Sequence, residues 1–293
     1  MPGSGLTVKS FAKINLGLEV RGRRPDGYHE ILTLFQTVSF CDILTFRTLS
    51  EPGIRLTGDD PGVPWDETNL IHRAARLFNR TTGARTGAAV DVRKHVPAGK
   101  GLGGGSANAA VTLWALNELR QTGLDRRALQ ALGRELGADV PYFLEGGLCL
   151  GRGRGDELDP LPDLPETAVL IVLPPFPIST AEIYAHCRPA LTSGGEPGRI
   201  SQFLDNKDFE LLENQLEETI FRFHPSLEDV KSFLKKQGAA AAMVTGSGSA
   251  VYGLFPEREK AEAVRAALPA GTVSVLAGTL SREAYWTALR AGV

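Results

Sequence analysis

Apolar and polar residues alternate near the start of the chain, in residues 12–20. Alanine, isoleucine, leucine and valine occupy every second position there, while Lys13, Asn15 and Glu19 lie between them. A period of two residues is that of a β-strand, whose successive side chains point to opposite faces of a sheet. The pattern therefore predicts a strand with one apolar face and a second face that carries Lys13, Asn15 and Glu19.

Further along the chain, apolar positions recur at helical or at strand spacing. In residues 68–81, Ile71, Ala74, Ala75 and Phe78 would form the buried stripe of a helix. The same reasoning predicts helices at 106–119, 126–136 and 226–237, and strands at 89–96, 169–173, 239–245, 250–255 and 273–277. Residues 24–27, Arg-Pro-Asp-Gly, predict a turn that follows the first strand.

Length and composition indicate a globular protein of two domains. At 293 residues the chain reaches the size at which one core usually divides, and one large domain is the alternative. Apolar residues make up 42% and charged residues 23%, so the chain can bury a proper core. Residues 156–165 carry three prolines and no periodicity, and we place the boundary there, with domains at 1–159 and 160–293.

The charges and the cysteines argue against several classes of function. The 32 Lys and Arg residues nearly match the 34 Asp and Glu residues without runs of like charge, so we expect neither a nucleic acid nor a membrane as partner. No apolar stretch reaches the ~18 residues that span a bilayer, and the first ten residues do not resemble a secretory signal. The three cysteines and five histidines are scattered, which indicates no disulfide framework and no zinc site. We expect a cytoplasmic protein.

The strongest chemical signal is a glycine-rich loop between a predicted strand and a predicted helix. Five of the seven residues 99–105 are glycines, and Ser106 follows at the start of the helix. Glycines leave backbone N–H groups unobstructed, and the helix adds the positive end of its dipole. Both features are typical of a site for a polyphosphate, whereas a plain surface loop usually carries mixed polar residues.

The order of residues in this loop separates it from two known kinds of phosphate loop. A Walker A loop needs Gly-Lys followed by Ser or Thr, whereas Lys100 is followed by Gly101, so that class is excluded. Gly99, Gly101 and Gly104 do match G-x-G-x-x-G. A dinucleotide fold, however, needs another strand after the helix, and Asp125 opens a second helix instead. A dehydrogenase is therefore a second choice.

Two shorter motifs each allow an ordinary and a functional interpretation. Asp139 stands before an apolar turn with a proline near its start, which suits either a helix N-cap or a carboxylate held in a site. Residues 243–250 join two predicted strands, either as a plain hairpin turn or as a cluster that donates hydrogen bonds to an anion. The residues alone leave both motifs open.

Five motifs, in their order along residues 10–280, resemble those of the GHMP kinase superfamily. They are Ala12-Lys-Ile-Asn-Leu, Arg24-Pro-Asp-Gly-Tyr-His29, the glycine-rich loop, Gly137-Ala-Asp-Val-Pro and Thr245-Gly-Ser-Gly. The resemblance is to the members that phosphorylate a cytidine-diphosphate-linked sugar alcohol in the non-mevalonate route to isoprenoid precursors. It implies an α+β fold with an N-terminal nucleotide-binding domain, a C-terminal ferredoxin-like domain and an active site between them.

The resemblance implies transfer of a phosphoryl group from ATP to a hydroxyl group, with Lys13 and Asp139 as the catalytic pair. A carboxylate can accept the proton of the attacking alcohol while an ammonium offsets the developing charge. The resemblance also assigns the ATP phosphates to Pro97, Gly99, Gly101, Leu102, Gly103, Gly104, Gly105 and Ser106, and the region near adenine to Lys94 and Asn69.

The second substrate is assigned, again by resemblance, to seven residues that recognise cytosine or lie near the sugar alcohol. They are Asn15, Tyr28, His29, Thr180, Tyr184, Gly246 and Ser247. Two tyrosine rings can sandwich the base while the histidine bonds its edge. Homoserine or mevalonate kinases remain an alternative, but their substrates contain no base to stack. A non-catalytic nucleotide sensor is the other alternative, against which both catalytic residues argue.

One departure concerns the metal. Ala107 stands where the family loop commonly has a second serine, so the metal ligand stays open and we assign no residue to a metal. We expect Mg²⁺ to arrive with ATP, held mainly by phosphate oxygens and water. The expected partner is a small molecule with a cytidine diphosphate group, and the expected state is a monomer or weak homodimer.

Overall fold

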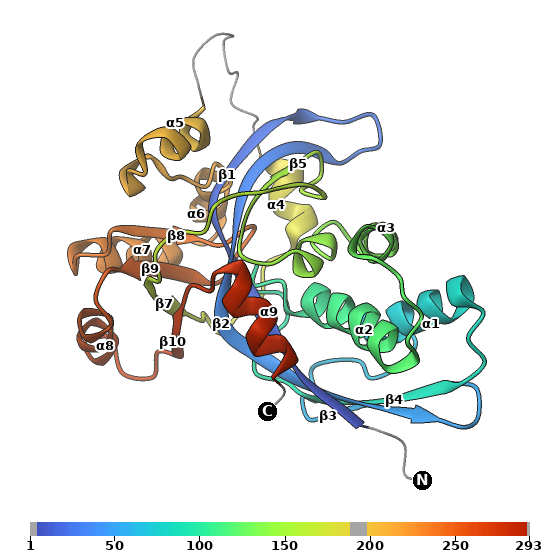
Figure 1. Ribbon diagram of the computed structural model, residues 1–293. Helices are drawn as coiled ribbons and strands as arrows, with labels where there is room; N and C mark the ends of the chain where they lie inside the picture. Colours follow the sequence, from blue (N-terminus) through green and yellow to red (C-terminus); the bar gives the residue numbers. More distant parts are fainter. Residues whose placement is uncertain (1–4, 188–197, 292–293) are drawn as a thin grey trace.

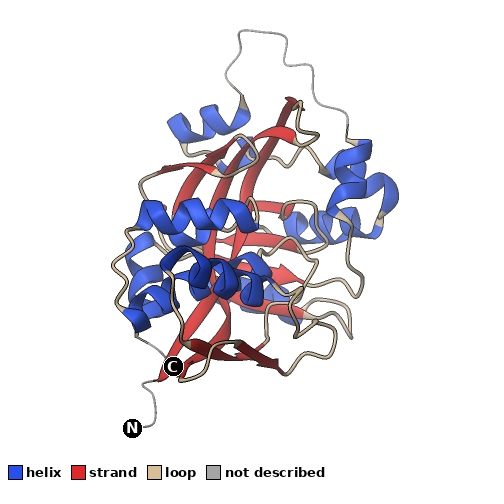
Figure 2. Ribbon diagram, turned by 90° about the vertical axis from the view of Figure 1, so that its right-hand side faces the viewer, coloured by secondary structure: helices blue, strands red, loops and turns tan. Residues whose placement is uncertain are grey.

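The computed structural model describes residues 5–187 and 198–291, in which two β-sheets lie beside each other with helices around them. In Figure 1 the long strands β1 (Gly5–Arg23) and β2 (His29–Leu49) run through the middle of the molecule. The side view shows strands in the interior and helices packed around them (Figure 2). Ala12 and Ile14 of β1 share one apolar core with Val169 and Met243 of the second sheet, so the two sheets are packed together.

The first sheet has the order β3-β4-β2-β5-β6, with β1 paired to β2. Its other strands are β3 (Ile54–Gly58), β4 (Gly87–Arg93), β5 (Leu148–Arg152) and β6 (Glu157–Pro160). Its helices are α1 (Leu70–Thr82), α2 (Gly104–Arg120), α3 (Arg126–Leu136) and the 3₁₀ turn η1 (Pro141–Leu144). β3 and β4 are parallel and the remaining pairs are antiparallel.

The second sheet has the order β10-β7-β9-β8 and is antiparallel throughout. Its strands are β7 (Ala168–Val172), β8 (Ala241–Val244), β9 (Val251–Phe255) and β10 (Ser274–Gly278). Around them lie α4 (Thr180–His186), α5 (Arg199–Asn206), η2 (Phe209–Leu211), α6 (Glu217–Phe223), α7 (Ser226–Lys236) and α8 (Arg258–Ala266). In chain order the two middle strands are the first and the third, as in the ferredoxin-like βαββαβ arrangement. The expected ferredoxin-like C-terminal domain is thereby confirmed.

The last helix, α9 (Arg282–Arg290), returns from the second sheet to the first core. Tyr285 and Leu289 are buried there with residues of α2 and η1. The predicted boundary at 159 and 160 lies within β6, which pairs with β5 up to Pro160. The division into domains 1–159 and 160–293 stays a prediction.

The apolar patterns explain most of the helices. In α1, Ile71, Ala74, Ala75 and Phe78 are buried, as the helical spacing predicts. α2 is buried on nearly all sides because it lies between α1, α3 and the first sheet. Among the helices of the described residues, none is long and apolar enough to cross a membrane.

The predicted strand at 12–20 lies inside β1, which is longer and irregular. Its register with β2 shifts between Phe11 and Lys13, between Asn15 and Gly17, and between Val20 and Gly22. The first shift places extra residues in β2, and each of the other two places one extra residue in β1, so the strict alternation of β1 is interrupted. β1 is buried on both faces from Phe11 to Val20, because helices α2 and α9 pack against it and its apolar residues share a core with the second sheet. The polar side chains of this stretch therefore face the interior rather than solvent.

Candidate active site

A cavity of about 980 Å³ lies between the two sheets. It receives residues from the start of the chain, the glycine-rich loop, the turn before η1, α4 and the turn between β8 and β9. Predicted site residues that line it are Lys13, Asn15, Tyr28, His29, Gly101, Gly103, Asp139, Thr180, Tyr184, Gly246 and Ser247. The predicted catalytic and substrate residues, far apart in the sequence, thus surround one space.

Lys13 and Asp139 meet at the bottom of this cavity. The Lys13 Nζ atom lies 3.7 Å from Asp139 Oδ2 and donates a hydrogen bond of 2.6 Å to Asn15 Oδ1. Lys13 is buried, whereas the Asp139 side chain is 34% exposed. The ammonium is therefore fixed by the protein, and the carboxylate faces the open cavity.

Burial lowers the pKa of Lys13 from its ordinary value, because an ammonium loses its hydration inside the protein. The nearby Asp139 carboxylate opposes this effect and raises the pKa of Lys13 part of the way back. Asn15 is held in turn, since its Nδ2 donates to Thr33 Oγ1 at 2.8 Å and its backbone N–H donates to Thr245 Oγ1 at 3.1 Å. These bonds orient Asn15 so that its carbonyl oxygen faces Lys13.

Asp139 is not a helix cap. The residue that precedes η1 is Val140, and η1 has no side-chain cap. The ordinary interpretation of this motif, a capping carboxylate, is therefore wrong. The Asp139 carboxylate pairs with Lys13 and is 34% exposed, so it can also accept a hydrogen bond from a second group in the cavity.

The glycine-rich loop lies directly before α2. Gly99, Gly101 and Gly103 have φ between 68° and 75°, a conformation that other residues rarely adopt. Gly103 precedes the helix without a side-chain cap, so the first N–H groups of α2 have no side-chain acceptor. An anion at this end would also meet the positive end of the helix dipole, which no acidic residue in the first turn offsets.

The second glycine-rich segment, residues 245–250, is both a hairpin turn and a support for the first loop. It joins the antiparallel strands β8 and β9. Thr245 Oγ1 donates to the Gly101 carbonyl at 3.1 Å, and the Ala250 N–H donates to the Lys100 carbonyl at 3.1 Å. A Cβ at Gly101 would lie 2.0 Å from the Thr245 carbonyl oxygen, so only glycine allows this contact.

Lys100 does not point toward a phosphate. Its ammonium donates to the carbonyls of Pro174 at 2.7 Å and Phe176 at 2.5 Å, and the side chain is buried between the two loops. Lys100 therefore connects the glycine-rich loop to the second sheet, which agrees with the exclusion of a Walker A arrangement.

The outer part of the cavity is aromatic and cationic. The rings of His29 and Tyr184 lie 5.1 Å apart, and the Arg154 guanidinium lies 5.0 Å from the centre of the Tyr28 ring. Tyr28 is 54% exposed, so it is not a core residue. Burial lowers the pKa of His29, and the nearby Arg23 lowers it further. At neutral pH His29 is thus mainly an uncharged imidazole that can donate and accept one hydrogen bond each.

Thr180, Gly246 and Ser247 lie where α4 meets the turn between β8 and β9. The hydroxyl groups of Thr180 and Ser247 are 2.7 Å apart. Asn214 donates to the carbonyl of Gly246 at 2.7 Å, which holds this turn against the second sheet. A ligand in the cavity would meet two hydroxyl groups on a supported backbone.

Several residues predicted to bind ATP do not line this cavity. Asn69 caps α1, with its side chain accepting from the Ile71 N–H at 2.9 Å. The Lys94 ammonium is bound to the buried Asp42 carboxylate at 2.7 Å, and Leu102 is in the apolar core. The lining of the cavity also does not include these loop residues: Pro97, Gly99, Gly104, Gly105 and Ser106. Their contacts with a nucleotide stay predictions.

The sequence analysis missed two cationic residues of the cavity, Arg23 and Arg154. Arg154 is held by Asp156, whose Oδ2 accepts from its Nη2 at 2.8 Å. A signal was available in residues 151–156, Gly-Arg-Gly-Arg-Gly-Asp, where glycines alternate with arginines. Only the pairing of β5 with β2 shows that this segment lies beside Tyr28.

Metal-binding side chains do not gather in the described parts of the chain, which contain no group of three or more His, Cys, Asp or Glu that could hold an ion. Near the loop, Ser106 offers a hydroxyl group and Asp139 a carboxylate. A divalent cation here would need most of its oxygen ligands from a bound phosphate and from water.

Two regions of the chain match the models of known families. Residues 69–147 match the model of the GHMP kinases N terminal domain, and residues 194–272 match that of the GHMP kinases C terminal domain. The first match covers the glycine-rich loop and Asp139, and the second covers the turn between β8 and β9.

Individual proteins resemble this chain over most of its length. The 4-diphosphocytidyl-2-C-methyl-D-erythritol kinase of Pelotomaculum thermopropionicum is 40% identical over 89% of this chain and 93% of its own. That of Methylococcus capsulatus is 40% identical over 99% of this chain and 96% of its own. A crystal structure of a 4-(cytidine 5'-diphospho)-2C-methyl-D-erythritol kinase superposes with a TM-score of 0.81 at 35% identity, covering 94% of this chain and 99% of the other. A homoserine kinase from Cytophaga hutchinsonii has the same fold, with a TM-score of 0.75 at 21% identity over 94% of this chain and 95% of its own.

Proposed function

This chain belongs to the 4-diphosphocytidyl-2-C-methyl-D-erythritol kinases of the GHMP kinase family, and we propose from this that Lys13 and Asp139 carry its reaction. The reaction transfers the γ-phosphoryl group of ATP to the 2-hydroxyl of 4-diphosphocytidyl-2-C-methyl-D-erythritol and releases ADP. The relatives' names and the matching structure favour this substrate over homoserine or mevalonate. The α+β, two-domain GHMP fold is the one expected from the sequence.

The observation that carries the mechanism is that Lys13 and Asp139 line one cavity together with residues of the glycine-rich loop and with Tyr28, His29 and Tyr184. A hydroxyl group held near both charges can give its proton to Asp139 while its oxygen attacks the γ-phosphorus. The Lys13 ammonium offsets the negative charge that develops on that oxygen.

Mg²⁺ would accompany the nucleotide and neutralise phosphate charge, and it would be held mainly by phosphate oxygens and water. We propose that the backbone N–H groups at the start of α2 bind the phosphates. The residues named by resemblance, from Pro97 to Ser106, would surround the phosphates, with Lys94 and Asn69 near the adenine. Because the Lys94 ammonium is bound to Asp42, its contribution would come from the backbone or the side-chain stem.

We propose that the cytidine diphosphate group occupies the outer part of the cavity. His29 can read the edge of the cytosine ring, and the tyrosine rings can stack on its faces. Arg23 and Arg154 supply positive charge beside the base site, which suits a diphosphate. Cytoplasmic location and a monomer or weak homodimer remain part of this proposal.

The function is tested by measuring ADP release in a coupled assay with 4-diphosphocytidyl-2-C-methyl-D-erythritol, beside homoserine and mevalonate as control substrates. Turnover is expected with the cytidine compound alone. Comparable turnover with either control substrate would contradict the substrate assignment, and absence of ADP release with all three would contradict the kinase assignment.

Replacing Tyr28 or Tyr184 by Ala is expected to weaken binding of the cytidine substrate by about 1–3 kcal/mol, the magnitude of base–aromatic stacking in nucleic-acid complexes. Affinity for ATP should barely change, because both rings lie away from the glycine-rich loop. Calorimetric titration of each variant with each substrate measures both effects. Unaltered affinity for the cytidine substrate in both variants would contradict the stacking role.

Gly105→Val is expected to weaken ATP binding at least about tenfold, or ~1.4 kcal/mol. Gly105 is exposed in the first turn of α2, and a Cβ there would lie an ordinary 3.7 Å from Leu70 Cδ1. Gly103 is unsuitable for this test because its φ is 72° and a Cβ there would lie 2.7 Å from Phe143 Cζ. ATP titration and a melting curve separate binding from folding, with Gly105→Ala as the smaller control. Normal ATP affinity of a folded Gly105→Val protein would argue against the phosphate site.

A further inference from the structure

The segment that carries Asp139 has little regular structure of its own. Between α3 and β5 it forms the single turn η1 and then two glycines, Gly146 and Gly147, with φ near 70°. No side chain caps η1. The position of the Asp139 carboxylate beside Lys13 therefore depends on what holds the backbone of residues 137–147.

Helix α9 holds this backbone at two carbonyl groups. The Tyr285 hydroxyl donates to the carbonyl of Phe143 at 2.5 Å, and the Trp286 indole N–H donates to the carbonyl of Glu145 at 3.0 Å. Tyr285 is fully buried, and a Cβ at Gly146 would lie only 2.3 Å from its ring. The end of η1 is thus in direct contact with α9.

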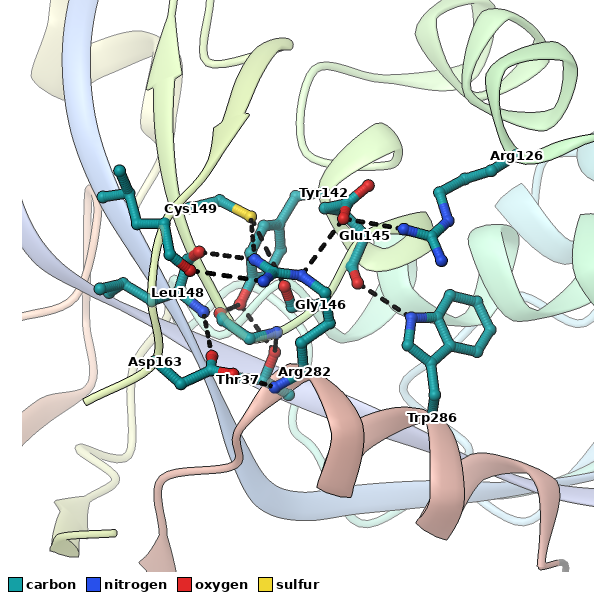
Figure 3. A network of polar contacts seen from close by, with 12 residues as sticks. Thr37, Arg126, Tyr142, Glu145, Gly146, Leu148, Cys149, Asp163, Arg282 and Trp286 are labelled. Carbon is teal, nitrogen blue, oxygen red and sulfur yellow. Dashed lines mark hydrogen bonds and ion pairs between the residues drawn. The ribbon is translucent and has the colours of Figure 1, made fainter. Parts of the chain in front are cut away.

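The Glu145 carboxylate forms ion pairs that also hold the end of η1 in position (Figure 3). Its Oε1 atom lies 2.9 Å from Arg126 Nη1 of α3 and 3.2 Å from Arg282 Nε of α9, and only 8% of the side chain is exposed. Arg282 also donates to the carbonyl of Leu148 at 2.8 Å. A buried carboxylate between two arginines connects α3, α9 and the end of η1.

The segment of residues 137–147 also contacts the glycine-rich loop. A Cβ at Gly103 would lie 2.7 Å from Phe143 Cζ and 3.2 Å from Lys13 Cγ, so the Phe143 ring lies against the loop near the catalytic lysine. A shift of η1 would therefore change the position of Asp139 relative to Lys13.

We propose that Tyr285 is a positioning residue for the reaction, which holds Asp139 beside Lys13 through its hydrogen bond to the backbone of η1. This inference rests on the proposed function, since it takes Asp139 as the proton acceptor. Helix α9, which contributes no residue to the lining of the cavity, would thereby support the catalytic pair from behind η1.

The test is Tyr285→Phe, which keeps the buried ring and removes one hydroxyl. With both substrates saturating, the single-turnover rate is expected to fall about tenfold, while the affinity for each substrate stays unchanged. The alkaline limb of the pH–rate profile should also move to lower pH. Asp139 is the charged neighbour that raises the pKa of Lys13, and Asn15, its other polar neighbour, is uncharged.

The control is Ser281→Ala, which removes the N-cap of α9, where Ser281 Oγ accepts from the Ala284 N–H at 3.1 Å, without touching η1. It should keep the wild-type rate. In an Asp139→Asn background, Tyr285→Phe should cause no further fall, because the group that it positions is gone.

The outcomes distinguish the positioning role of Tyr285 from the catalytic role of Asp139. A wild-type rate and pH profile for Tyr285→Phe, while Asp139→Asn is still slow, would overturn the positioning role. A wild-type rate for Asp139→Asn itself would instead overturn the catalytic pair on which the inference rests.

Discussion

Asp139→Asn is expected to lower the rate of phosphoryl transfer by roughly 10²–10⁴-fold, the usual contribution of a general base. The amide has the same shape as the carboxylate but cannot take the proton of the attacking hydroxyl group. Some stability should also be lost, because the buried Lys13 ammonium then lacks the carboxylate that offsets its burial, although no helix cap is removed. Single-turnover measurements with both substrates saturating give the rate, and a melting curve confirms the fold.

The pH dependence of this variant provides a second readout. The Asp139 carboxylate raises the pKa of Lys13, so its loss lowers that pKa further, and any activity that needs the ammonium should disappear at lower pH than in the wild type. If Asp139 only orients the hydroxyl group, the fall in rate will be near the lower end of the range. A wild-type rate in the folded variant would remove the carboxylate from the mechanism.

Lys13→Met is expected to lower the transfer rate by about 10²–10³-fold, the effect of removing one group that stabilises developing negative charge. The folded protein should not lose stability, because methionine can occupy the buried space of the Lys13 side chain without carrying a charge. Burial lowers the pKa of Lys13, which means that the folded state holds its protonated form at a cost. The cost is present in full below the lowered pKa of the folded state and falls away as pH rises from that pKa to the ordinary pKa of lysine.

Lys231→Met is the matched control for this substitution. The Nζ atom of Lys231 in α7 lies 2.5 Å from the Oε2 atom of Glu217 in α6. Both helices lie beside the second sheet, and Glu217 is buried. Losing this lysine leaves a buried carboxylate without its cation, so stability should fall while the transfer rate is kept. The two lysines should thus respond in opposite ways in rate and in melting temperature. Comparable rates in Lys13→Met and wild type would contradict the role of the ammonium.

Local patterns in the sequence predict a large part of this fold. Spacing of apolar residues locates α1, α2, α3 and α7 and the strands of the second sheet within a few residues. The glycine-rich loop is visible because its backbone needs conformations that glycine alone adopts easily. β2 was not predicted, although it is the longest strand at 21 residues. Its residues 33–38 are buried on both faces and lack the alternation of a half-exposed strand, whereas residues 42–47 do alternate and were overlooked.

The motifs determined which residue types are present, and their resemblance to a family suggested the roles. The sequence could not decide whether Asp139 is a cap or a free carboxylate, because both use the same residue before the same proline. The structure decides it through the absence of a cap at η1 and the ion pair with Lys13, 126 positions away along the chain. The resemblance likewise placed Lys94 near the adenine, and Lys100 lies within the glycine-rich loop, whereas the structure shows that buried acceptors hold both ammonium groups.

By itself, the sequence determined the local chemistry of this protein: the strand that carries Lys13 and Asn15, the glycine-rich turn before an apolar helix, and the family to which these motifs belong. Those features depend on neighbours within a few residues, and such neighbours are adjacent in any conformation. Only the tertiary structure decided that Arg154 lies on Tyr28, that Tyr184 lies on His29, and that α9 supports η1. These contacts join segments that only the packing of two sheets brings together, and no local pattern records which distant segment a side chain will meet.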